Sequence, residues 1–170
     1  NVFLSREIPN DNYLKNLPVI SNLKKIKELE LTKPVTFIVG ENGVGKSTLI
    51  EGIAVAMGFN AEGGSINFCF STKESHSNLH EYITVGRGCR KHKDGFFLRA
   101  ESFYNVASNI DYLDKDGGGP PIISSYGGIS LHEQSHGESF MALVENRFFG
   151  NGLYILDEPE AALSPMRLME

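Results

Sequence analysis

The chain has 170 residues, of which 41% are hydrophobic and 22% are charged, a balance typical of a globular domain that buries a core. This composition excludes a disordered chain, a collagen-like chain and a small disulfide-rich scaffold. The formal net charge is −5, so no overall positive field draws the chain to nucleic acid or anionic lipid. With two cysteines, no membrane-length apolar run and no signal-peptide pattern, we expect a soluble, cytoplasmic protein.

The first third of the chain predicts two strands and one helix. Residues 23–31 alternate apolar and polar side chains, which is typical of a half-exposed strand. Residues 35–39 form an apolar, β-branched run that suits a buried strand. Residues 46–57 predict a helix, and Gly58 is expected to end it.

The middle of the chain, at about residues 63–100, predicts a β-rich subdomain. Residues 82–85 and 96–98 are expected as strands on either side of a polar turn at residues 90–95. Basic side chains around this turn are interpreted as a solvated hairpin tip, with contact to a nucleic-acid backbone as the alternative. These side chains are Arg87, Arg90, Lys91, His92 and Lys93.

The last third predicts two helices and a second buried strand. Residues 101–113 and 138–149 have helical periodicity, and a loop rich in glycine and proline at residues 116–121 lies between them. Residues 153–156 are a short apolar run that suits a strand. Two buried strands, each joined to a helix, predict an α/β fold with a mostly parallel central sheet, to which a β-rich subdomain and a short helical insert are added.

The loop that begins at Gly40 carries the most specific motif of the sequence. It matches G-x-x-x-x-G-K-[ST], and it stands between a predicted strand and a predicted helix, as a phosphate-binding loop requires. Glycines allow the backbone N–H groups to face a phosphate, and the helix N-terminus favours the same anion. Lys46 is expected to pair with the β- and γ-phosphates, and the Ser47 hydroxyl to bind Mg²⁺. The residues expected to hold the nucleotide are Asn42, Gly43, Val44, Gly45, Lys46, Ser47 and Thr48.

Two acidic residues follow the second predicted strand. Asp157 stands at the carboxyl end of this strand, where open α/β folds bind ligands, and it is expected to hold Mg²⁺. Glu158 is expected to polarise the attacking water, so that Glu158 and Lys46 are the catalytic candidates. The alternative is an acidic helix start, because acids favour a first turn and Pro159 favours the first helical position. The phosphate loop in the same short chain favours the catalytic interpretation.

Residues 155–165 (ILDEPEAALSP) resemble the Walker B strand and D-loop of ABC-type ATPases. Residues 134–139 resemble the signature motif of that family, usually Leu-Ser-Gly-Gly-Gln. The resemblance implies that Ser135 and Gly137 contact the γ-phosphate held by a second subunit. The same residues fit an S-x-x-E helix cap, and the two roles are compatible. The motif departs from the family pattern at Gln134, His136 and Glu138.

In detail the chain is similar to small stand-alone bacterial ATPases of the ABC class, also called AAA family or predicted ATPases, which are related to SMC and DNA-repair heads. Residues 95–103 and 130–139 carry this narrower resemblance. It implies ATP and Mg²⁺ as cofactors, hydrolysis to ADP and phosphate, and an ATP-dependent head-to-tail homodimer. A DNA-associated or defence role is implied as well, with nucleic acid left open as a partner. The alternatives are a transporter subunit and a P-loop kinase.

The sequence is expected to be a fragment that contains a single ATP-binding domain over residues 1–170. It begins at Asn1 rather than at methionine and ends at Glu170 inside a stretch with helical character. The switch histidine of the ABC-type family would then lie beyond Glu170. Glu101 is the nearest candidate for the glutamine of the family's Q-loop.

Overall fold

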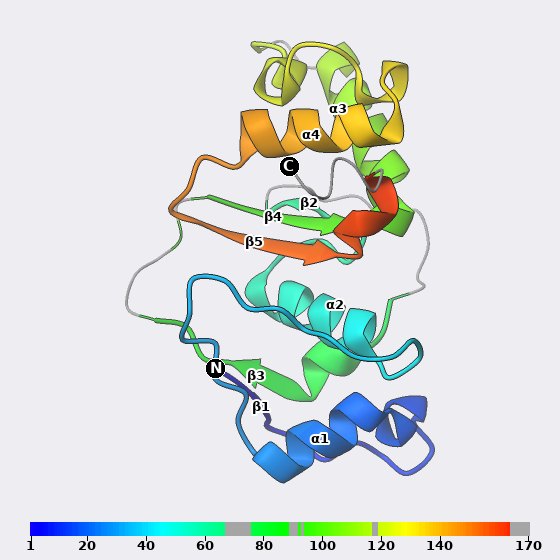
Figure 1. The fold of residues 1–170 in the computed structure, drawn as a ribbon, viewed down its shortest axis with the longest axis vertical. Helices are drawn as coiled ribbons and strands as arrows, with labels where there is room; N and C mark the ends of the chain where they lie inside the picture. The colour runs from blue at the N-terminus through cyan, green and yellow to red at the C-terminus, as the bar shows by residue number, and fades with distance from the viewer. Residues whose placement is uncertain (67–75, 89–91, 93, 117–118, 164–170) are drawn as a thin grey trace. The chain divides into compact units, whose positions relative to one another are not determined.

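The computed structural model describes residues 1–66, 76–88, 92, 94–116 and 119–163. The chain divides into two compact units. The first is formed by Asn1–Ala61 together with Ser75–Lys91, and the second by Glu62–Glu74 together with His92–Glu170. Figure 1 colours the chain from the N-terminus to the C-terminus, so that the elements of each unit can be followed.

In the first unit, one helix packs against a small antiparallel sheet (Figure 1). The helix α2 (Lys46–Met57) contacts β3 (Ile83–Val85), and β3 pairs with β1 (Val2–Leu4). Two 3-10 helices, Tyr13–Asn16 and Leu79–Glu81, complete the unit together with α1 (Pro18–Ile26). Its buried side chains include Val2, Ile8, Leu14, Ile20, Leu23, Leu49, Ile53, Leu79 and Ile83.

The helix predicted at residues 46–57 is confirmed with the same bounds. Gly58 follows it as C-cap in the left-handed conformation, with φ of +97°, and its N–H donates to the carbonyl oxygens of Ala54 and Val55. Glycine adopts this conformation without the steric penalty that a Cβ brings, which is why the helix ends at Gly58.

The strand predicted at residues 23–31 is wrong. Residues up to Ile26 belong to α1, and Leu29 makes only an isolated bridge with Val2. Helix α1 begins five residues before the alternating stretch, with Pro18 at the first position that proline favours. Ile20 and Leu23 stand three residues apart and are both buried, so the helical period and not the local alternation decides the structure.

The buried strand predicted at residues 35–39 is not formed either. The run has no strand assignment, and Val35, Phe37 and Val39 are 67%, 83% and 86% exposed. A strand is stabilised by hydrogen bonds to a neighbouring strand, and the described strands of the first unit pair only with each other. An apolar, β-branched composition was therefore not sufficient to produce this element.

The second unit contains a three-stranded sheet in the order β2-β4-β5. The short strand β2 (Gly64–Ser65) is antiparallel to β4 (Asp94–Arg99), whereas β4 is parallel to β5 (Gly152–Asp157). The described part of the chain therefore contains a parallel strand pair within a mixed sheet, but not the mostly parallel central sheet that the sequence predicts. Strand β5 is only partly buried, and Leu156 is 36% exposed.

The strands predicted at residues 82–85 and 96–98 are both present, but the hairpin between them is wrong. The first is β3, which pairs with β1, whereas the second belongs to β4, which pairs with β2 and β5. Non-local pairing, which the short-range pattern does not encode, decides the partners of each strand. Of the basic residues predicted at the hairpin tip, Arg90, Lys91 and Lys93 lie outside the described residues.

Two helices cover a hydrophobic core in the second unit. They are α3 (Phe103–Asp116) and α4 (His136–Arg147), so both predicted helices are confirmed with bounds shifted by two or three residues. Short 3-10 helices occupy Ala100–Ser102, Ile122–Tyr126, Leu131–Glu133 and Pro159–Ala162. The core consists of Phe96, Leu98, Phe103, Val106, Ala107, Ile110, Tyr126, Leu131, Phe140 and Leu143.

None of the helices among the described residues combines the length and the apolar character that crossing a membrane requires.

Candidate functional site

Two glycines give the phosphate loop its shape. Gly43 has a φ of +80°, and Gly45, the N-cap of α2, has a φ of +94°, both in the left-handed region. A Cβ at Gly45 would lie 2.8 Å from Val19 Cγ1 and 3.3 Å from Leu17 Cδ1, whereas a Cβ at Gly43 would meet nothing within 4 Å. Gly45 is therefore required by both conformation and space, and Gly43 by conformation alone.

The N-terminal end of α1 packs against the phosphate loop. The backbone N–H of Val19 donates to the carbonyl oxygen of Val44 at 3.0 Å, in addition to the contacts of Leu17 and Val19 near Gly45. These contacts fix the backbone just before α2 begins. Sequence reasoning does not anticipate this support, because residues 23–26 of α1 belong to the stretch that predicts a strand.

The side chain of Lys46 folds over the loop. Its Nζ donates to the carbonyl oxygens of Gly40 at 2.8 Å and Glu41 at 2.9 Å, while Lys46, Ser47 and the following Thr48 are half-buried. The first backbone N–H groups of α2 have no carbonyl partners within the helix, and they carry its positive dipole end. An ammonium group beside such a helix start forms a site suited to an anion, in particular a phosphate.

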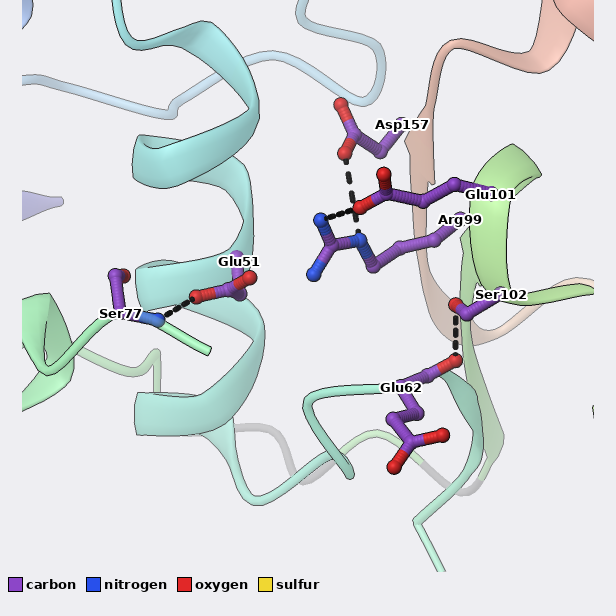
Figure 2. Close-up of polar contacts among 7 residues, drawn as sticks. All are labelled: Glu51, Glu62, Ser77, Arg99, Glu101, Ser102 and Asp157. Carbon is purple, nitrogen blue, oxygen red and sulfur yellow. Dashed lines mark hydrogen bonds and ion pairs between the residues drawn. The ribbon is translucent and has the colours of Figure 1, made fainter. Parts of the chain in front are cut away.

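Asp157 is buried at the carboxyl end of β5, with 5% of its surface exposed. Arg99, the last residue of β4, is its partner in the parallel register, and the two side chains approach to 3.7 Å between Arg99 Nε and Asp157 Oδ2. A second nitrogen of Arg99 contacts Glu101. Figure 2 shows the guanidinium group with both of these carboxylates.

Glu158 follows Asp157 in an unusual backbone conformation. Its φ is +53°, a left-handed value that costs a residue with a side chain about 1–3 kcal/mol. Glu158 is exposed, and its carbonyl oxygen accepts a hydrogen bond of 3.0 Å from the N–H of Ala161 in the 3-10 helix that begins at Pro159. The helix start predicted as the structural alternative is therefore present as a short 3-10 turn, and the catalytic role of Glu158 stays a prediction.

A family model described as an AAA domain matches residues 14–118, which is more than half of the chain. The chain belongs to the AAA domain family. Membership makes it a P-loop α/β protein of the ATPase type and indicates nucleotide binding. Comparison with curated proteins found no match, and comparison with solved structures found none either.

The match covers the phosphate loop of this AAA domain, including Lys46 and Ser47. It ends before Ser135 and before the pair formed by Asp157 and Glu158, which belong to the second unit. The match therefore assigns no role to these three residues.

Helix α4, which lies beyond the residues that the family model matches, begins with a capping box. Ser135 is the N-cap: its Oγ donates to Glu138 Oε2 at 2.6 Å and accepts from the Glu138 N–H at 3.4 Å. The Ser135 N–H also donates to Glu138 Oε2 at 3.0 Å. The predicted S-x-x-E cap is thus confirmed. Ser135 is exposed and Gly137 is half-buried.

A second ion pair lies at the opposite end of β4, and sequence reasoning did not identify it. Arg147 Nη1 lies 2.8 Å from Asp94 Oδ1, and the Tyr154 hydroxyl donates to Asp94 Oδ2 at 2.9 Å. Burial raises the pKa of the Asp94 carboxyl, but hydrogen bonds from Tyr154, from the Gly95 backbone and from Arg147 outweigh burial and hold this pKa below its ordinary value. Burial also raises the pKa of the Tyr154 hydroxyl, and its bond to Asp94 adds to the increase.

Each unit also contains a buried polar contact that fixes a connecting segment (Figure 2). In the first unit, Glu51 of α2 is 5% exposed and accepts a hydrogen bond of 2.7 Å from the Ser77 N–H. In the second unit, the Ser102 hydroxyl donates to the carbonyl oxygen of Glu62. Neither contact is predictable from the sequence, because an acid in an apolar helix and a serine after a strand can each bond to many different partners.

Proposed function

We propose that the chain binds ATP with Mg²⁺ and hydrolyses it to ADP and phosphate as an ABC-type ATPase. The observation that carries the proposal is the phosphate loop, in which two left-handed glycines lead into α2 and Lys46 stands at its first position. The combination of helix start, glycine backbone and ammonium group is the one that binds the phosphates of a nucleotide.

Lys46 has the chemistry to exchange its present partners for phosphate oxygens. Its ammonium group donates to two neutral carbonyl oxygens, those of Gly40 and Glu41. A phosphate oxygen carries a negative charge that a carbonyl oxygen lacks, so the attraction between the ammonium group and the phosphate favours the exchange. The loop then holds the triphosphate through the backbone N–H groups of residues 42–48.

Mg²⁺ prefers oxygen ligands, and it is commonly held by one or two protein groups together with phosphates and water. The Ser47 hydroxyl and the Asp157 carboxylate are each oxygen donors of this type, so the chemistry of each residue fits the ion. Bound Mg²⁺ would neutralise charge on the phosphate oxygens during transfer to water.

Glu158 is proposed to polarise the water that attacks the γ-phosphate. Its exposed carboxylate and its strained backbone support this role, because strain of this kind is concentrated at functional sites. Ser135 and Gly137 at the start of α4 are proposed to contact the γ-phosphate bound by a second copy in a head-to-tail dimer. For this contact the Ser135 hydroxyl must turn away from Glu138, to which it now donates.

A DNA-associated or defence role is proposed from the resemblance alone. Among the basic residues near the predicted turn, Arg87 donates to the carbonyl oxygen of Ala56 at 3.2 Å and so caps the end of α2. DNA binding by the protein, measured at two salt concentrations, tests this part of the proposal separately from ATP turnover.

The test of the proposal combines phosphate release with the mass of the particle in solution. Glu158→Gln is expected to bind ATP, to stop turnover and to shift from monomer to dimer only with Mg²⁺-ATP, as measured by light scattering. Glu145→Gln, which changes an exposed acid on α4 in the same way, serves as the matched control and should hydrolyse ATP like the wild type. Normal turnover by Glu158→Gln would contradict the catalytic role, and an unchanged mass with ATP bound would contradict the dimer.

A further inference from the structure

We propose that Arg99 is a positioning residue that holds the Asp157 carboxylate until a divalent cation displaces it. The inference rests on the proposed role of Asp157 as a ligand of Mg²⁺. Arg99 and the cation compete for the Asp157 carboxylate, so the affinity for the metal depends on a residue that does not itself bind the metal.

The parallel register of β4 and β5 creates the contact. Arg99 and Asp157 are directly paired at the ends of the two strands, and Arg99 Nε lies 3.7 Å from Asp157 Oδ2. Both side chains are shielded from solvent, with 14% of the Arg99 side-chain surface and 7% of the Asp157 side-chain surface exposed. A carboxylate that is removed from water needs a partner of opposite charge, and Arg99 supplies it.

A divalent cation and the Arg99 guanidinium group are both positively charged, so they repel each other when both contact the Asp157 carboxylate. In a shielded position this repulsion is little weakened by water or salt. Binding of a cation to Asp157 therefore requires that Arg99 move away. The present distance of 3.7 Å is longer than a direct hydrogen bond, so this contact is suited to exchange.

Glu101 gives Arg99 a partner to retain after the exchange. Arg99 contacts the Glu101 carboxylate through a different nitrogen from the one nearest Asp157, and Glu101 is 72% exposed (Figure 2). When Arg99 leaves Asp157, its charge thus stays paired at the surface. An arginine charge that is shielded and unpaired is strongly unfavourable, and this cost would oppose metal binding. The contact with Glu101 avoids that cost.

The other ion pair of β4 provides a contrast and a control. Arg147 and Asp94 approach to 2.8 Å, and Asp94 also accepts the Tyr154 hydroxyl, so this acid is fully engaged in the fold. The exposure of Arg147 is 20%, close to that of Arg99. Arg147→Gln therefore removes the same charge from an arginine of similar exposure, which belongs to α4 and pairs with the opposite end of β4 from Arg99.

The experiment is a titration of the protein with Mn²⁺ in the presence of a nonhydrolysable ATP analogue, followed by electron paramagnetic resonance. Arg99→Gln is expected to bind Mn²⁺ about tenfold more tightly than the wild type, because it removes both the competitor and its repulsion. Arg99→Lys, which keeps the charge, should return the affinity toward the wild-type value. Arg147→Gln should leave it unchanged.

Glu101→Gln gives a second measurement, at an exposed position where substitutions usually change stability little. Without its alternative partner Arg99 should hold Asp157 more firmly, so the affinity for Mn²⁺ should fall. The two substitutions therefore act in opposite directions, whereas a loss of structure would weaken binding in both. An unchanged or weaker affinity in Arg99→Gln, or an unchanged or tighter affinity in Glu101→Gln, would overturn the inference.

Asp157→Asn separates this inference from the proposed function. If Asp157→Asn weakens Mn²⁺ binding while Arg99→Gln has no effect, the metal role of Asp157 stands and the role of Arg99 is overturned. If Asp157→Asn leaves Mn²⁺ binding unchanged, the metal role itself fails, and the inference about Arg99 fails with it.

Discussion

Gly45, at the start of α2, tests how tightly the phosphate loop is packed against α1. In Gly45→Ala the new Cβ would lie 2.8 Å from Val19 Cγ1 and 3.3 Å from Leu17 Cδ1, at a φ of +94°. The left-handed conformation costs alanine about 1–2 kcal/mol, and overpacking adds about 1–3 kcal/mol. We expect the free energy of unfolding to fall by about 2–5 kcal/mol, as measured by urea denaturation without nucleotide.

Gly43→Ala is the matched control for this substitution. Gly43 also has a positive φ, +80°, but an added Cβ would meet nothing within 4 Å. Only the conformational cost of about 1–2 kcal/mol applies to it, so the difference between the two variants measures the packing of α1 on the loop. If Gly45→Ala is no more destabilising than Gly43→Ala, the reasoning about this packing is refuted.

Three further predictions concern the second unit. Burial raises the pKa of the Asp94 carboxyl, but hydrogen bonds from Tyr154, from the Gly95 backbone and from Arg147 lower this pKa overall. The contribution of Asp94 to stability is therefore fully present above its ordinary pKa of 3.8 and is lost as the pH falls through the lower folded value. The difference in unfolding free energy between wild type and Asp94→Asn should therefore shrink in acid, and a constant difference between pH 7 and pH 2 would contradict the assignment. Ser135→Ala should lower the free energy of unfolding by about 1 kcal/mol, because α4 loses its N-cap, as thermal denaturation would measure. Ser135→Thr keeps a hydroxyl at the cap and should retain most of this stabilisation. Ser102→Ala should lower the free energy of unfolding by about 1–3 kcal/mol, because the Glu62 carbonyl oxygen loses the hydrogen bond from the Ser102 hydroxyl. Amide hydrogen exchange near Glu62 should then accelerate.

The parts of the fold that the sequence predicted well are those with local signals. Helix α2 begins and ends at the expected residues because a glycine and a lysine mark its start and Gly58 its end. The cap of α4 is likewise predictable, because Ser135 and Glu138 form hydrogen bonds with each other within four residues. Such contacts depend on few residues close in sequence, so a pattern is enough to find them.

The parts that sequence reasoning missed depend on distant partners. The run at residues 35–39 has the composition of a strand, yet its state is decided by whether a neighbour pairs with it. The same applies to the candidate site: Asp157 was identified from the acid after an apolar run, but its contact with Arg99 follows from the strand register. No spacing in the sequence indicates that register.

The pairing of β4 with β5 also has a consequence for the order of folding. Residues 100–151, with α3 and α4, separate the two strands, so their parallel pairing closes a long loop at a considerable entropic cost. Contacts of such high sequence separation form slowly, after local helices have condensed. The Arg99–Asp157 contact therefore forms late, and a chain still emerging from the ribosome cannot make it until β5 has been synthesised.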